Sequence, residues 1–390
     1  MSNEPWALKY RPRRFGDIVG QEANATILRS MVQEDRIVHG ICLTGPRGTG
    51  KTSTARIIAA AYNCARRTED GEPCGECARC MEVRRGISVD VQEMDAASHG
   101  LVADIRKLAT DAQYVGADGS YRVYVLDEAH SMSRQAFDSM LKILEEPPRR
   151  VMFILCTTEF DKLPETITSR CMIFGYRALT QRSIVGRLRQ IADAEKVGAT
   201  DEQLTRIARA SRGGLRDAVM LMEQLAIYGE NTITDEALDG VIGEVPFAQF
   251  LFIFQAQIAS DTGALVVALR ELFEKHGDVS AVLSGYLEFL RDYALVQAGA
   301  GSATELDRAE VKELREVDVE LARIFRCADR VSAAIGEVRR RIVHGRLQAE
   351  LAMMECTFVL SGELSAVAPE VAEATEAAQK VAVDFGGRVL

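Results

Sequence analysis

Residues 43–54 of this 390-residue chain read LTGPRGTGKTST, and this stretch decides the fold of the first half. It contains a complete G-x-x-x-x-G-K-T loop, from Gly45 to Thr52. Residues 41–44 before the loop form a short apolar run typical of a buried parallel strand, and residues 53–62 after it are Ala- and Ile-rich, as in a helix. A glycine-rich loop between a strand and a helix cradles phosphates with its backbone N–H groups. The stretch therefore predicts a binding site for a nucleoside triphosphate.

The side chains of the loop have distinct roles that follow from their chemistry. The ammonium group of Lys51 reaches the β- and γ-phosphates, and the hydroxyl group of Thr52 ligates Mg²⁺. Lys51 is therefore predicted to be catalytic as well as nucleotide-binding, and ATP and Mg²⁺ are the expected cofactors. The predicted phosphate-binding set is Gly45, Pro46, Arg47, Gly48, Thr49, Gly50, Lys51, Thr52 and Ser53.

The acidic pair Asp127-Glu128 is the second pattern that carries chemistry, and it follows the apolar run YRVYVL at 121–126. A carboxylate at the end of a strand beside the phosphate loop holds Mg²⁺, and the next carboxylate orients an attacking water as a general base. We assign Asp127 to the metal and Glu128 to the water. The pair is followed by Ala129 and His130, which superficially suggests a helicase box. We interpret His130 as structural or supporting rather than catalytic.

Four cysteines form the third pattern: Cys64, and then Cys74, Cys77 and Cys80 in two overlapping C-x-x-C steps. Four thiolates at this spacing are enough for a closed tetrahedral zinc site, and a closed site is structural. The alternative is a coincidence of free thiols. The other five cysteines lie in apolar or helical settings and are expected to be buried core thiols.

Strands and helices alternate up to about residue 178, and only helices are predicted beyond it. Further strand patterns at 89–94 and 151–156 indicate an α/β fold with a parallel sheet, helices on both faces and the nucleotide at the carboxyl ends of the strands. The predicted helices are 22–34, 53–62, 101–112 and 134–146 in the first part, and include 247–259, 264–275, 280–296 and 317–348 in the last part.

Composition places the chain among ordinary globular proteins. Net charge is −10, yet residues 1–180 balance at 24 basic and 24 acidic side chains, so the acidic excess lies in residues 181–390. Nucleic-acid binding is therefore not indicated by charge alone. No apolar run long enough to span a membrane is present, and residues 1–14 do not resemble a signal peptide. We expect a cytoplasmic protein.

The motifs, taken in order, resemble those of the AAA+ clamp-loader ATPases. The resemblance covers residues from about 6 to 225, and the four-cysteine insertion together with Ser169-Arg170-Cys171 makes it specific. The motifs that carry it are YRPRRFGDIVGQE, GPRGTGKTSTARIIA, the cysteine insertion, DAAS, VYVLDEAH, LKILEEPP, TTE, SRC and GGLRDA.

The resemblance implies further site residues and an organisation into domains. Thr158 would sense the γ-phosphate, Arg216 would draw a lid onto ATP, and Arg170 would complete the site of a neighbouring subunit. The domains would be an AAA+ ATPase domain over 1–178 with a zinc-binding insertion at 64–80, a helical lid over 179–243, a helical collar over 244–360, and a tail over 361–390 that is expected to be frayed or disordered. The adenine pocket would be lined by Ala7, Tyr10, Arg11, Pro12, Ile18 and Val19.

The implied function is that of the ATPase motor subunit of a clamp loader within a DNA polymerase holoenzyme. Its partners would be other clamp-loader subunits in a hetero-pentameric ring, a sliding clamp and primer–template DNA, with no membrane. Residues 98–101 would donate N–H groups to DNA phosphates or form an ordinary capping turn. The family's full-length form has a long Pro/Ala-rich tail, whereas this sequence ends at Leu390 without one. We therefore expect a short or phage-encoded form.

Three other functions remain to be distinguished from this one. A DEAH-type helicase needs a second RecA-like domain, whereas residues 181–390 read as helical throughout. A non-hydrolysing structural clamp-loader subunit loses the phosphate loop or the acidic pair, and both are present here. Another AAA+ DNA-remodelling ATPase would lack the zinc insertion and Ser169-Arg170-Cys171.

Overall fold

The computed structural model describes residues 4–97, 120–242, 245–304, 306, 308–339 and 345–362. These residues fall into two compact units, which meet between Ile242 and Gly243 in the chain. Each unit is described by itself below. The predicted helix at 101–112 and most of the tail at 361–390 lie outside the described residues.

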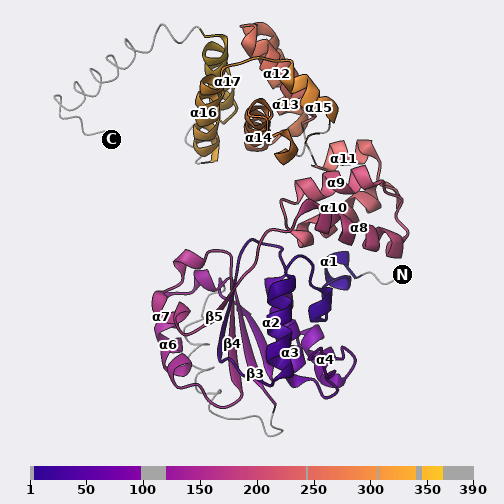
Figure 1. The fold of residues 1–390 in the computed structure, drawn as a ribbon, viewed down its shortest axis with the longest axis vertical. Helices are drawn as coiled ribbons and strands as arrows, with labels where there is room; N and C mark the ends of the chain where they lie inside the picture. Colours follow the sequence, from indigo (N-terminus) through magenta and orange to yellow (C-terminus); the bar gives the residue numbers. More distant parts are fainter. Residues whose placement is uncertain are drawn as a thin grey trace, which may run out of the picture. The chain divides into compact units, whose positions relative to one another are not determined.

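A five-stranded parallel sheet forms the centre of the first unit, with the strand order β2-β3-β4-β1-β5. The carboxyl ends of β1, β3 and β4 therefore meet at one edge of the sheet, which is where such folds bind ligands. Figure 1 shows the strands with helices on either side. The strands are β1 (Gly40–Thr44), β2 (Val91–Asp95), β3 (Arg122–Asp127), β4 (Val151–Thr157) and β5 (Met172–Gly175).

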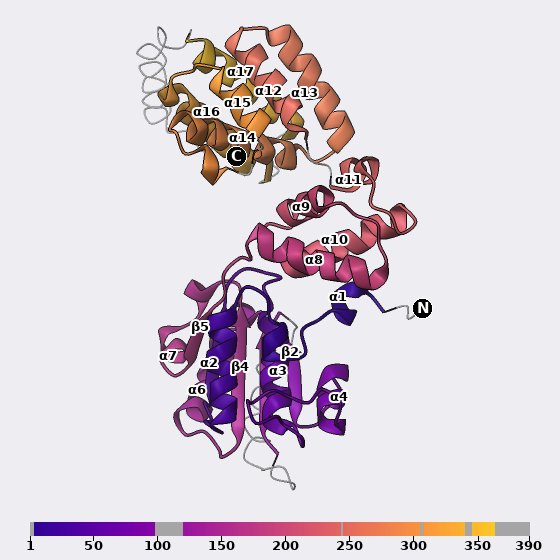
Figure 2. The ribbon, with the colours of Figure 1, turned by 45° about the vertical axis from the view of Figure 1, so that its right-hand side comes forward.

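Alternation along the strands sends apolar side chains into two separate cores, one on each face of the sheet. In β1, Ile41 and Leu43 pack with the helices of one face, whereas Cys42 belongs to the core on the other face. The first face carries α2 (Glu22–Gln33) and α3 (Lys51–Asn63), which lie in front of the sheet in Figure 2. The other face carries α6 (Arg134–Glu145) and α7 (Glu165–Thr168). The predicted sheet with helices on both faces is therefore confirmed.

Four helices follow the sheet and share a core of their own. That core also takes in side chains from the N-terminal segment, among them Trp6 and Tyr10. Helix α10 begins at Leu215, directly after the predicted break at Gly213-Gly214. The four helices are α8 (Gln181–Glu195), α9 (Asp201–Ala210), α10 (Leu215–Tyr228) and α11 (Asp235–Ile242), and the N-terminal segment forms α1 (Trp6–Lys9) and the short 3-10 turn η1 (Phe15–Asp17).

The regular secondary structure in the described residues of the second unit is helical, and the helices share a large apolar core. Its aromatic side chains, such as Phe254, Phe289 and Tyr293, lie within ring-contact distance of one another. The elements are α12 (Phe247–Ile258), α13 (Thr262–His276), α14 (Val279–Gln297), the turn η4 (Gly301–Ala303), α15 (Arg308–Arg315), α16 (Leu321–Arg339) and α17 (Gly345–Ser361).

One expectation about secondary structure was wrong, and one strand was missed. The range 317–348 is not one helix, because α16 and α17 pack side by side, with Arg330 paired to Glu355 and the thiols of Cys327 and Cys356 each facing the other's backbone. Strand β5 was not predicted, since its four residues are too few for a period-2 pattern to stand out.

No single helix among the described residues is long and apolar enough to cross a membrane. Only α11 and α12 taken as a consecutive pair reach that length and composition.

Candidate functional site

The glycine-rich loop lies between the carboxyl end of β1 and the first turn of α3, as the sequence predicts. Gly45 approaches the backbone so closely that a Cβ atom there would lie 2.1 Å from the carbonyl oxygen of Tyr176. Gly50 precedes α3 with φ of +101°, a conformation that side chains rarely adopt. These two positions require glycine, and they shape the loop around the N-terminus of α3, where phosphate groups bind in such folds.

Lys51 is folded back into the loop and is 7% exposed. Its Nζ donates to the carbonyl oxygens of Gly45 and Pro46, at 2.7 Å in each case. Burial lowers the pKa of Lys51 below its usual value, against the opposing effect of the carboxylates of Glu128 and Asp127. A desolvated ammonium group of this kind gains strongly from an anionic ligand such as a phosphate.

Thr52 and Asp127 meet across the loop, with Thr52 Oγ1 donating to Asp127 Oδ2 at 2.8 Å. A hydroxyl and a carboxylate oxygen at this separation are the donor set that Mg²⁺ takes from a protein in nucleotide sites. The donors that the sequence assigns to the metal therefore lie together and fit the ion.

Glu128 occupies a left-handed backbone conformation, with φ of +49°. Such a conformation is rare for a residue with a large side chain and marks a position held by its surroundings. Thr158 Oγ1 lies 3.3 Å from Glu128 Oε2, so the predicted sensor and the predicted general base contact each other. His130 lies beside both, with Nδ1 3.5 Å from Glu128 Oε2.

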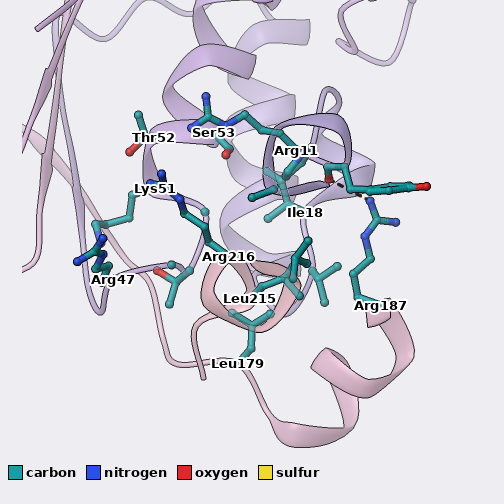
Figure 3. A pocket seen from close by; sticks show the side chains of 18 of the residues that line it. Arg11, Ile18, Arg47, Lys51, Thr52, Ser53, Leu179, Arg187, Leu215 and Arg216 are labelled. Carbon is teal, nitrogen blue, oxygen red and sulfur yellow. Dashed lines mark hydrogen bonds between the residues drawn. The ribbon is translucent and has the colours of Figure 1, made fainter. Parts of the chain in front are cut away.

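The loop opens into a cavity of about 380 Å³ whose walls come from four parts of the first unit. This volume is within the range of small-ligand sites. Figure 3 shows that Leu215 and Arg216 of α10 face the loop across the cavity, and that Arg187 of α8 lies against the N-terminal segment, where its side chain donates to Tyr10 O at 3.3 Å. The lining contains Ala7, Tyr10, Arg11, Pro12, Ile18, Val19, Arg47, Gly48, Thr49, Gly50, Lys51, Thr52, Ser53, Asp127, Glu128 and Arg216, all predicted from the sequence.

The charges of the lining favour an anion. Five cationic side chains line the cavity, against the three carboxylates Asp95, Asp127 and Glu128. The excess of positive charge matches a nucleoside triphosphate bound to Mg²⁺, which retains roughly two negative charges near neutral pH. The five cations are Arg11, Arg47, Lys51, Arg187 and Arg216.

Arg11 extends toward Ser53 and the first turn of α3 in Figure 3. Burial and the nearby guanidinium group of Arg56 lower the pKa of Arg11. This position lies toward the phosphate-binding loop, whereas the resemblance had placed Arg11 with the adenine pocket. Ile18 and Val19 remain the apolar part of the lining on that side.

Seven lining residues were not predicted, and three predicted residues lie outside the lining. Gly45, Pro46 and Thr158 do not line the cavity. Asp95 could have been found, because it ends β2 in register with Asp127 at the end of β3. The others lie on helices or at their margins, where an amphipathic pattern does not tell which residues face a ligand. The additional residues are Trp6, Asp95, Leu179, Arg187, Ile191, Leu215 and Val219.

The four predicted zinc-binding cysteines lie together at the start of α4 (Ala78–Arg85), with all their sulfur atoms within 4.8 Å of one another. The Sγ atoms of Cys64 and Cys77 are 4.0 Å apart, as are those of Cys74 and Cys80. Zn–S bonds of about 2.3 Å in a tetrahedron place the sulfurs about 3.8 Å apart, so the arrangement fits zinc.

Backbone N–H groups also point at these sulfur atoms. Cys74 N lies 3.3 Å from Cys64 Sγ, and Cys77 N lies 3.3 Å from Cys74 Sγ. Burial by itself raises the pKa of Cys74, but the N–H groups of Glu76 and Cys77 and the neighbouring thiols together lower it to about 6. The thiolate form of Cys74 is thus favoured, and the pKa of Cys77 is lowered as well, whereas burial raises the pKa of Cys64 and that of Cys80.

Arg170 lies away from the cavity, after the last turn of α7. Its guanidinium group donates to Thr166 O and to Glu145 Oε1, both at 2.7 Å, and about a third of the side chain is exposed. The chain therefore does not bring Arg170 to its own nucleotide pocket. Residues 98–101, the predicted DNA contact, lie outside the described residues.

Two family models match stretches of the first unit. Residues 20–180 match the family model for the DNA polymerase III delta subunit, and residues 183–231 match the ATPase lid domain of a DNA polymerase III clamp loader subunit. A solved RuvB Holliday junction branch migration motor from Thermotoga maritima is 18% identical over 67% of this chain and 85% of its own, with a TM-score of 0.45.

Curated relatives cover most of the chain. The tau subunit of DNA polymerase III from Escherichia coli K12 is 38% identical over 76% of this chain and 46% of its own length, and that of Bacillus subtilis 168 is 36% identical over 78% and 54%. The chain thus spans about half the length of these relatives. The gamma subunit from Buchnera aphidicola subsp. Baizongia pistaciae is 33% identical over 75% of this chain and 78% of its own length. On this evidence the chain belongs to the gamma/tau family of DNA polymerase III subunits.

Proposed function

We propose that this chain is the ATP-hydrolysing motor subunit of a clamp loader, which opens a sliding clamp and places it on primer–template DNA. The observation that carries the proposal is the single cavity that joins the phosphate loop, the Asp127-Glu128 pair, the N-terminal segment and Arg216 of α10. In this proposal α8 to α11 are the lid, because α8 and α10 supply the far wall of the cavity and the four helices share one core.

Hydrolysis would follow the chemistry of the groups at the carboxyl ends of β3 and β4. Thr52 and Asp127 would hold Mg²⁺, which would supply positive charge to the phosphates. Glu128 accepts a proton from a water molecule whose oxygen attacks the γ-phosphorus, and the bond to the β–γ bridging oxygen breaks to give ADP and phosphate. Thr158 contacts the general base and is placed to respond to the γ-phosphate.

Arg170 would act on a neighbouring subunit. Its distance from its own cavity and its partial exposure leave it available at a subunit boundary, where an arginine stabilises charge on the γ-phosphate of the next site. The proposed partners are thus the neighbouring clamp-loader subunits, together with the sliding clamp and primer–template DNA on which the assembly acts. The pairing with Glu145 holds the guanidinium group in place near the surface.

The second unit would be the collar that holds the ring together. Large apolar side chains on α16 and α17, including Phe325, Leu351 and Phe358, are exposed in the single chain. Apolar surface of this kind is typical of interfaces.

The zinc site would be structural, since the four thiols complete the tetrahedron and leave no position for a substrate.

The non-hydrolysing subunit and the other AAA+ DNA-remodelling ATPase remain the alternatives. The assay that distinguishes them measures ATP turnover by the chain, assembled with its partner subunits, with and without primed DNA and the cognate clamp. We expect primed DNA and clamp together to stimulate turnover, and Lys51→Ala to abolish it. Lys275→Ala, at an exposed lysine of α13 outside the cavity lining, is the control and should behave as the wild type. Turnover that ignores DNA and clamp, or that survives Lys51→Ala, would contradict the proposal.

A further inference from the structure

His130 joins the two turns that carry the predicted general base and the predicted γ-phosphate sensor. It lies in the 3-10 turn η2 (Ala129–Ser131), directly after Glu128. Its ring is 14% exposed, with Nδ1 3.2 Å from Thr157 Oγ1 and Nε2 3.2 Å from Glu159 Oε1. The imidazole thus contacts the residue before Thr158 and the residue after it.

The need for such a connection follows from the sheet. The pairing of β3 with β4 ends at Leu126 and Leu155, so no ladder hydrogen bond joins the two strands at Glu128 and Thr158. Past that point the turns are connected through side chains. β3 stays paired with β2 as far as Asp127, and β4 stays paired with β1 as far as Thr157, so Glu128 and Thr158 are the first residues beyond these ladders. A displacement of the general base by about 1 Å costs roughly 10²-fold in rate.

The hydrogen bonds around Thr157 fix the direction of this contact. Thr157 Oγ1 accepts the N–H of Glu159 at 3.0 Å, so its own proton is available for the ring nitrogen Nδ1 of His130. Nε2 then carries the ring proton and donates it to the carboxylate of Glu159, which Lys162 also contacts at 2.8 Å. Both ring nitrogens are therefore engaged by the turn that follows β4.

With the turn after β4 held in this way, the Thr158 hydroxyl group lies 3.3 Å from Glu128 Oε2. Glu128 itself has a left-handed backbone conformation. We propose that His130 is a positioning residue for ATP hydrolysis, which fixes Glu128 relative to Thr158 by binding Thr157 and Glu159. The inference rests on the proposed function, because it assigns a role within the same site. His130 does not line the cavity.

The test is a kinetic comparison of His130→Ala with wild type, in the assembled complex. We expect kcat to fall about 10- to 100-fold, while KM and the Kd for ATP stay within about twofold, because the phosphate loop is untouched. His130→Asn retains a polar atom near the position of Nδ1 and should recover part of the loss. Thr157→Val should lower kcat in the same direction and add little to His130→Ala.

His39 provides the matched control, since its Nδ1 contacts Val151 O at 2.7 Å at the opposite end of β4. His39→Ala removes an imidazole hydrogen bond from the same strand and should leave kcat unchanged per folded molecule. If His130→Ala keeps the wild-type kcat, or if it and His39→Ala lose activity only in proportion to unfolded protein, His130 has a structural role and the inference is wrong. A wild-type complex without any ATP turnover would overturn the proposed function as well.

Discussion

At the scale of single residues, the site rests on a lysine folded into the phosphate loop and on a hydroxyl–carboxylate pair beside it. Lys51, Thr52 and Asp127 are recognisable because their spacing and their flanking strands admit few other uses, and the structure places them together. Arg187 and Trp6 were not recognisable in this way. They line the cavity only because the four-helix group folds back over the N-terminal segment, a tertiary contact that no local pattern records.

Glu128→Gln tests the assignment of the general base. The amide keeps the shape of the side chain and its contact with Thr158 but is a far weaker base. We expect kcat to fall by about 10²-fold or more, with the affinity for ATP retained. Single-turnover hydrolysis and equilibrium binding of a fluorescent ATP analogue measure the two quantities separately. Asp161→Asn, an exposed carboxylate in the same region, should change neither, and comparable losses in both variants would refute the assignment.

At the scale of elements, the sheet and most helices could be predicted because their apolar periods are long enough to read. β5 has only four residues, and its place beside β1 comes from pairing with a strand more than a hundred residues earlier. The sequence predicts one helix over 317–348 where the structure has α16 and α17. Both helices are apolar on one side, so the apolar periodicity alone does not reveal the break between them. The fold-back appears only through contacts such as Arg330 with Glu355.

The cysteine insertion is the element whose stability should depend on a metal. Glu72, which is 8% exposed, accepts the N–H groups of Phe15 and Gly16 at 2.8 and 3.0 Å, so the insertion also holds the N-terminal segment. Metal binding to preformed thiolates contributes directly to folding. Losing the metal should therefore loosen both the insertion and the N-terminal segment that lines the cavity.

We expect native mass spectrometry to find one zinc ion per chain, removable by a chelator with a fall in the melting temperature. Cys74→Ser should abolish stoichiometric zinc, and ATP binding should weaken along with it. Cys171→Ala, at a thiol outside the cluster, should keep the zinc. A chain that is fully folded and free of zinc after expression in zinc-containing medium would show that the cluster is not a metal site.

At the scale of the whole molecule, the two compact units point to separate tasks for nucleotide chemistry and assembly. The nucleotide cavity belongs entirely to the first unit, but Arg170 does not reach it. In the proposed assembly a neighbour would complete the site, so hydrolysis would depend on assembly and ATP would be consumed only when subunits are correctly placed.

Mixing two inactive variants tests this dependence. Lys51→Ala removes the phosphate contact and Arg170→Ala removes the residue acting in trans, so each alone should be severely impaired. A mixed assembly contains interfaces at which an intact Lys51 meets an intact Arg170, and we expect it to recover part of the wild-type turnover. If Arg170 acted within its own chain, mixing would restore nothing, because neither variant chain contains both an intact Lys51 and an intact Arg170.

The central claim is that ATP hydrolysis by this chain drives the placement of a clamp on DNA. The most direct measurement follows a fluorescent clamp onto primed circular DNA in the presence of the assembled complex. The account predicts closed clamps on DNA with ATP, and strongly reduced release of closed clamps with Glu128→Gln or a non-hydrolysable analogue. Equal clamp loading by the wild-type complex and by complexes with Lys51→Ala, or no loading at all by a complex that hydrolyses ATP, would contradict it.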